Sequence, residues 1–138
     1  MRHVKRDTAV KNISVVRAVV GAVTWIAPRP SAKLFGLDSD ANPQAPYIGR
    51  LFGARDVALA AGTLTTDGEA QDRWLVAGLG CDVADAAAGI AAWRAGYLST
   101  LSSVLVTAAA LNGVVLGVLA LRGGDGAAPQ AAPPAPAA

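Results

Sequence analysis

The longest uncharged stretch of the sequence covers residues 98–121, LSTLSSVLVTAAALNGVVLGVLAL. It exceeds the ~20 residues that a helix needs to cross ~30 Å of hydrocarbon at ~1.5 Å per residue. A helix of this length at the surface of a soluble core would carry a polar face. The stretch therefore predicts a transmembrane helix, and this prediction constrains how the rest of the chain can fold.

Three earlier segments are apolar over most of their length but are interrupted by charges: residues 12–27, 47–64 and 74–93. Large aromatic rings stand at or near the ends of the predicted spans, where a membrane favours amphipathic side chains. These residues are Trp25, Tyr47, Trp74, Trp93 and Tyr97. The fold class predicted for the chain is all-α, as a four-helix transmembrane bundle.

The composition agrees with a membrane protein and excludes several other classes. Hydrophobic residues make up 53% of the chain and charged residues 16%, against about 25% charged residues in soluble domains. The net charge of +2, without a basic stripe beyond the first eleven residues, argues against a nucleic-acid partner. Cys81 is the only cysteine and His3 the only histidine, so we expect no metal site, no cofactor and no histidine-based catalytic pair.

The domain organisation follows from the flanking segments. Residues 1–11 form a basic head, residues 12–122 the transmembrane domain, and residues 123–138 an alanine- and proline-rich tail expected to be disordered. Prolines bracket the first connection, which is expected to hold one interfacial turn capped by Gly36. The second connection, TTDGEAQDR at residues 65–73, is acidic and typical of turns.

Lysine and arginine in the flanks predict the orientation. With four spans, one side of the membrane holds Arg2, Lys5, Arg6, Lys11, Arg73 and Arg122, and the other holds Arg29, Lys33 and Arg94. The chain is therefore expected in the cell membrane as a multi-pass protein with both termini in the cytoplasm. A signal peptide is the competing interpretation of the first segment, but Arg17 interrupts the apolar run and no cleavage site follows.

Six ionisable residues lie inside the predicted spans. They are Arg17, Arg50, Arg55, Asp56, Asp82 and Asp85. A charged residue at the centre of a membrane helix costs ~2.5–3.5 kcal/mol on insertion scales. Since three of the six are basic and three acidic, the set could be neutral overall. We expect these side chains to face one another or a wet cavity.

Depth along each helix predicts which charges meet. Arg55 and Asp85 each lie eight residues from the outer end of their span, which is ~12 Å at the rise of an α-helix. Arg17 and Asp82 lie ten and eleven residues from their outer ends. The predicted contacts are therefore Arg55 with Asp85 and Arg17 with Asp82. Arg50 is only three residues from its end and is expected to reach the headgroups by snorkelling.

Glycines spaced four apart predict close helix packing. Gly49 and Gly53 form one such G-x-x-x-G pair and Gly113 and Gly117 another, and pairs of this kind let helix backbones approach closely in lipid. Gly78 precedes Gly80 in GLGCDV, which lacks the third glycine of a dinucleotide-binding fingerprint. The glycines therefore predict packing sites and no nucleotide site.

The stretch YIGRLFGARDVALAAGTL, followed by GLGCDVADAAAG, resembles uncharacterised bacterial and fungal families of small four-pass membrane proteins, of the DUF4267-like type. The matching patterns are R-x-x-G-x-R-D on the second helix and D-x-x-D on the third, within residues 15–119. They correspond to Arg50, Gly53, Arg55, Asp56, Asp82 and Asp85. The resemblance implies a four-pass topology and this choice of site residues, and it brings no activity.

Three hypotheses for function use the same charges. The first is an accessory or scaffold protein that performs no chemistry, or one that binds a lipid-like ligand, with a membrane protein or a second copy as partner. Its candidate ligand-binding residues are Arg17, Arg55, Asp56, Asp82 and Asp85. The alternative is an isomerase, cyclase or oxygenase-like enzyme on a hydrophobic metabolite, with Asp82 or Asp85 as general acid and Arg55 holding an oxyanion. The third is a proton or small-ion pathway along Asp56, Asp82 and Asp85.

These hypotheses predict different structures. An apolar cavity that opens onto the aspartates favours ligand binding or catalysis. Tight arginine–aspartate pairs without such a cavity favour the scaffold. A continuous polar path to both membrane faces favours transport.

Overall fold

The computed structural model describes residues 2–123, which form five helices and no strand. The helices are α1 (Arg2–Ile26), α2 (Pro28–Leu34), α3 (Ala45–Leu64), α4 (Gly68–Arg94) and α5 (Thr100–Arg122). The predicted all-α class is therefore confirmed for this part of the chain. The disordered tail that we expected over residues 123–138 lies outside the described residues, apart from Gly123.

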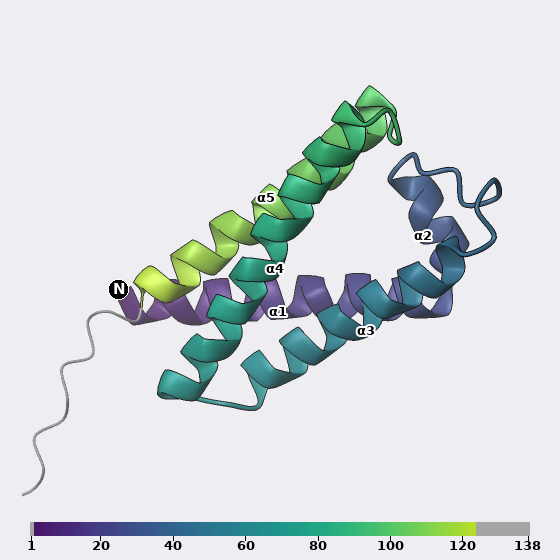
Figure 1. Cartoon of the computed structure of the whole chain (residues 1–138). Helices are drawn as coiled ribbons and strands as arrows, with labels where there is room; N and C mark the ends of the chain where they lie inside the picture. Colours follow the sequence, from purple (N-terminus) through teal and green to yellow (C-terminus); the bar gives the residue numbers. More distant parts are fainter. Residues whose placement is uncertain (1, 124–138) are drawn as a thin grey trace, which may run out of the picture.

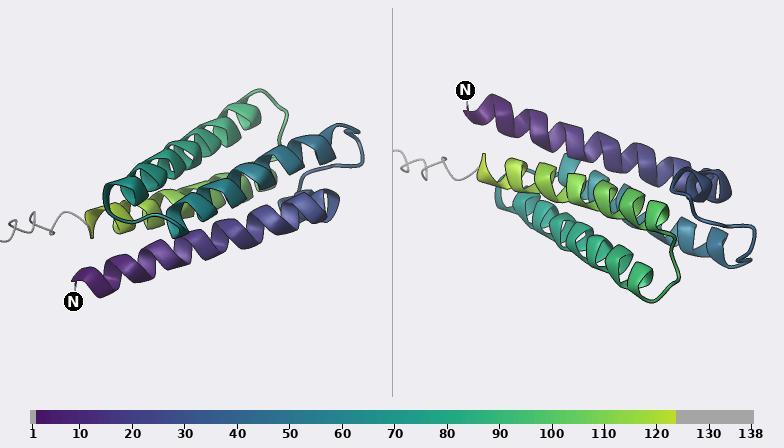
Figure 2. Two further views of the ribbon diagram at one scale, coloured as in Figure 1. Left: turned by 90° about the horizontal axis from the view of Figure 1, so that it is seen from below. Right: turned by 90° about the horizontal axis from the view of Figure 1, so that it is seen from above.

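The four long helices form two antiparallel pairs, α1 with α3 and α4 with α5 (Figures 1 and 2). The start of α1, the α3–α4 connection and the end of α5 share one end of the molecule. At the opposite end, Ser102 Oγ in α5 donates a hydrogen bond of 2.7 Å to the carbonyl of Gly36, which follows α2. Successive long helices therefore run in alternating directions.

Two helices begin earlier than the sequence predicted. The first span was expected to start at residue 12, but α1 begins at Arg2, so the basic head is helical. The third span was expected to start at residue 74, but α4 begins at Gly68 and includes most of the acidic connection. Glu69 in the first turn of α4 interacts favourably with the amino end of the helix, which supports the early start.

Long-range contacts also hold this early turn of α4. Arg6 Nη2 lies 2.7 Å from an oxygen of Asp72 and donates to the amide oxygen of Gln71 at 3.2 Å. The Gln71 side-chain amide donates to the carbonyls of Thr63 and Thr66, at 3.0 and 2.9 Å. The Thr63 carbonyl is one of the last four of α3, which lack partners within the helix, and Thr66 lies just after the helix. The segment that appeared to be a loop therefore joins three helices.

The side chains inside the molecule are mostly small and often polar, whereas many of those on its surface are large and apolar. Buried side chains are mainly alanine, serine and threonine, and the largest one that is fully buried is Leu75. Large aliphatic side chains face outward on every long helix, among them Val19, Val23, Ile26, Ile48, Val57, Val76, Val83, Leu101, Val104, Val115 and Leu119. Soluble monomers rarely expose this many large apolar side chains, whereas lipid accommodates them, and small residues at helix contacts are typical of membrane bundles.

Three helical segments are long and apolar enough to cross a membrane: Arg6–Ile26, Gly68–Arg94 and Thr100–Arg122. The remaining long helix, α3, has 20 residues but carries Arg50, Arg55 and Asp56. These charges lower its mean hydropathy and separate it from the other three. The fold therefore has the features of a membrane protein, and α3 is the long helix of the described residues that is not among the candidate spans.

The close contact between α1 and α3 is made by two glycines. A Cβ atom placed on Gly53 would lie 2.6 Å from the carbonyl oxygen of Gly21 and 2.9 Å from the backbone nitrogen of Trp25. A Cβ atom on Gly21 would in turn lie 2.7 Å from the carbonyl oxygen of Gly53. The predicted packing role of Gly53 is thereby confirmed, and its partner Gly21 is a finding of the structure.

Candidate functional site

Five charged side chains from α1, α3 and α4 form two ion-paired groups, here together called the Arg/Asp cluster. It consists of Arg17, Arg55, Asp56, Asp82 and Asp85. Both contacts predicted from helix depth are present. Arg17 Nη2 donates to Asp82 Oδ2. Arg55 uses both terminal nitrogens on Asp85, at 3.0 Å and 2.7 Å, in the two-pronged geometry that gives arginine–carboxylate pairs their strength.

Glycines make room for the deeper pair. The side chains of Arg17 and Asp82 are only 6% and 14% exposed. The Arg17 guanidinium lies against Gly78, so closely that a Cβ atom there would overlap it. On the other side, a Cβ atom on Gly113 would lie 2.5–2.8 Å from the Asp82 carboxyl group. The pair is thus enclosed between two positions that have no side chain.

The role of Gly113 differs from the expectation. The G-x-x-x-G spacing predicted that Gly113 and Gly117 bring helix backbones together. At Gly113 the space is occupied by the Asp82 carboxyl group, and at Gly117 an added Cβ would lie in ordinary contact, 3.7 Å from Leu79. The missing side chain at residue 113 therefore accommodates a charge.

The second pair lies at the surface between α3 and α4. The side chains of Arg55 and Asp85 are 31% and 33% exposed. Arg55 also donates to its neighbour Asp56, at 3.3 Å from Nε and 3.1 Å from Nη2, and its guanidinium lies 4.5 Å from the centre of the Phe52 ring. One guanidinium thus binds two carboxyl groups and an aromatic face, a favourable arrangement for a cation outside water.

The charges of the Arg/Asp cluster do not balance. It contains two guanidinium groups and three carboxyl groups. The six charged residues of the predicted spans were neutral overall only because Arg50 was among them. In the structure Arg50 is exposed and pairs with no acidic side chain of residues 2–123. The five remaining groups therefore carry one negative charge in excess when all of them are ionised.

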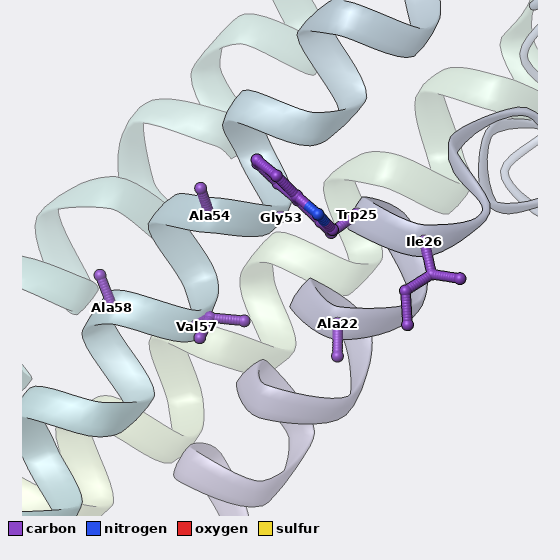
Figure 3. Close-up of a pocket in the computed structure, with 7 residues that line it drawn as sticks. All are labelled: Ala22, Trp25, Ile26, Gly53, Ala54, Val57 and Ala58. Atoms are coloured by element: carbon purple, nitrogen blue, oxygen red, sulfur yellow. The ribbon is translucent and has the colours of Figure 1, made fainter.

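A groove lies between α1 and α3 (Figure 3). Its volume is about 470 Å³. It is lined by Ala22, Trp25, Ile26, Gly53, Ala54, Val57 and Ala58. None of these residues is charged, so the groove does not open onto the aspartates. Of the three arrangements distinguished above, the described residues show tight pairing within the Arg/Asp cluster, and this groove does not lead to it.

Sequence reasoning missed three features of the site and its surroundings. Gly78 was considered only as part of a nucleotide fingerprint, although its lack of a side chain is what admits Arg17. The approach of Gly21 to Gly53 was hidden because Gly21 has no glycine four residues away. Arg6 was counted only as a flanking positive charge, whereas it pairs with Asp72.

No protein-family model, no curated protein and no solved structure matches the chain.

Proposed function

We propose that this chain is a four-span integral membrane protein that serves as an accessory or scaffold subunit and performs no chemistry of its own. The observation that carries the proposal is the mutual pairing within the Arg/Asp cluster. Each of its arginines donates to a carboxyl group of the cluster, and each carboxyl group accepts from an arginine. Charges used in this way fix the positions of α1, α3 and α4.

The pairing also supports α3 as the fourth span. Its 20 residues give a length of ~30 Å, enough to cross the hydrocarbon. Arg55 and Asp56 are engaged with partners, which reduces the cost of placing them in lipid. The antiparallel packing of α3 on α1 also supports a crossing α3, and in our proposal both termini lie on the side rich in lysine and arginine, the cytoplasm.

The exposed pair supports an accessory role. Arg55 and Asp85 sit near the middle of their helices and are each about one third exposed, so their outer edges would meet lipid tails in an isolated monomer. The surplus carboxylate on the same cluster favours a partner that supplies a basic or polar side chain. A second membrane protein of that chemistry, or a second copy of this chain, fits that requirement.

The topology is tested by labelling single cysteines in a background in which Cys81 is replaced by serine. Asp38→Cys lies in the α2–α3 connection and Asp67→Cys in the α3–α4 connection. A membrane-impermeant thiol reagent is expected to label the two positions from opposite sides. Labelling of both from the same side would show that α3 does not cross.

The structural role is tested by removing single carboxylates. Asp82→Asn and Asp85→Asn are each expected to lower the melting temperature of the detergent-purified protein, because each leaves an arginine without its ionic partner. A carboxyl group kept for catalysis would instead be replaceable without loss of stability. Unchanged melting of both variants would therefore contradict the scaffold proposal.

One observation favours a second candidate, the proton site. The surplus negative charge of the Arg/Asp cluster can be neutralised by one proton held among Asp56, Asp82 and Asp85. Proteoliposomes containing a pH-sensitive dye would report proton flux through the protein. Flux that is lost in Asp56→Asn would favour this candidate over the scaffold. Catalysis at Asp82 or Asp85 has no comparable support, since the groove does not reach either residue.

A further inference from the structure

One arginine, Arg50, shares a face of α3 with the residues that line the groove between α1 and α3. Arg50 precedes Gly53, Ala54 and Val57 by three, four and seven residues. These spacings place Arg50 on the same face of α3 as the groove, one turn closer to the end of the helix that faces α2. Arg50 therefore lies in line with the α3 residues of the groove on one face of that helix, and the groove together with Arg50 is here called the strip.

The cation of this strip is available to a ligand. Arg50 is exposed, and none of the ion pairs of the described residues includes it. It lies five residues from the first residue of α3, and an arginine at this depth extends its long side chain to the headgroup level. Trp25, which lines the groove, is half-exposed, and its indole N–H has no acceptor within residues 2–123.

We propose that this strip binds one anionic phospholipid of the bilayer. An acyl chain would occupy the apolar groove, the phosphate would accept hydrogen bonds from Arg50, and the Trp25 indole would donate to the interfacial oxygens. The groove volume of about 470 Å³ falls within the ~300–1,000 Å³ of small-molecule sites. Guanidinium groups suit phosphate because two parallel N–H donors match its oxygens. This inference rests on the proposed membrane location and names a ligand at a site separate from the Arg/Asp cluster.

The test is native mass spectrometry of the full chain released from micelles that contain phosphatidylglycerol or phosphatidylcholine with identical acyl chains. The wild-type protein is expected to retain phosphatidylglycerol at least several-fold more than phosphatidylcholine. Arg50→Gln is expected to abolish that preference. Arg94→Gln is the matched control, because Arg94 is an exposed arginine at the same end of the bundle but away from the groove. Its preference should equal that of the wild type.

A second pair of variants tests the acyl-chain part of the site. Ala54→Phe and Ala58→Leu fill the groove from exposed positions and are expected to reduce retention of both lipids several-fold. Circular dichroism and size-exclusion chromatography confirm that each variant is folded before its lipids are counted.

The proposal is overturned if the wild type shows no preference, if Arg50→Gln and Arg94→Gln lose it equally, or if folded groove variants retain lipid normally. Recovery of the protein in the soluble fraction of cells would refute the membrane location itself. A membrane-integrated protein without lipid preference would refute only the lipid site.

Discussion

The guanidinium of Arg17 lies against the backbone of Gly78, where any other residue would place its Cβ atom. The pair that Arg17 forms with Asp82 therefore depends on the absence of a side chain on α4. We predict that Gly78→Ala displaces Arg17 and lowers the melting temperature about as much as Asp82→Asn does. Gly80→Ala is the matched control on the same helix, because an added Cβ at residue 80 meets no atom within 4 Å. Equal melting temperatures of the two alanine variants would show that the close contact between Arg17 and Gly78 does not contribute to stability.

The surplus carboxylate predicts unequal effects of removing aspartates. Asp82→Asn leaves the buried Arg17 without an ionic partner, which in soluble proteins costs about 3–5 kcal/mol. Asp56→Asn removes the excess negative charge, while Arg55 keeps its two bonds to Asp85. We expect a marked decrease in melting temperature for Asp82→Asn and a small change for Asp56→Asn. If Asp56→Asn lowers the melting temperature more than Asp82→Asn does, the argument from the excess negative charge of the Arg/Asp cluster is wrong.

The contact between Gly21 and Gly53 predicts how α1 and α3 respond to added volume. A methyl group at either position meets backbone atoms, which cannot move unless the helices separate. Gly53→Ala is therefore expected to destabilise the bundle and to increase the rate at which protease cleaves the α2–α3 connection. Gly117→Ala, whose new Cβ would be in ordinary contact at 3.7 Å, serves as control. Similar cleavage rates for both variants would argue against a close approach of α1 and α3.

The pair between Arg6 and Asp72 predicts a weaker, salt-dependent contribution. Asp72 is 42% exposed, and ion pairs accessible to water typically contribute ~0–1 kcal/mol. Arg6→Gln should lower the melting temperature slightly at low ionic strength and hardly at all in high salt, where exposed charges are screened. A large effect that persists in high salt would mean that this pair contributes as much to stability as the buried pair of Arg17 and Asp82.

Helix depth was sufficient to predict both ion pairs, the buried one and the half-buried one. Charges at mid-membrane must find partners at the same level, so counting residues from the outer ends matched Arg55 with Asp85 and Arg17 with Asp82. The same requirement does not apply near the ends of the helices. There Arg50 reaches the surface, and the polar segment before Trp74 becomes helical because Arg6 and Gln71 supply its long-range bonds.

The glycine contacts were only partly predictable. A G-x-x-x-G spacing shows that one helix has a flat face, but it does not show what fills that face. At Gly53 it is the backbone at Gly21, and at Gly113 it is the Asp82 carboxyl group. The partner of an isolated glycine such as Gly78 depends on how the helices are rotated about their axes, which depth counting does not provide.

The central claim is that the arginine–aspartate pairs hold the bundle together. The most direct measurement compares Arg55→Asp, Asp85→Arg and the double variant by melting and size-exclusion chromatography of the detergent-purified protein. The double variant keeps the charge count and restores an ion pair between α3 and α4. We predict that both single variants lose stability and that the double variant recovers most of the loss. Single variants that melt like the wild type, or a double variant that loses as much as the two singles combined, would contradict the claim.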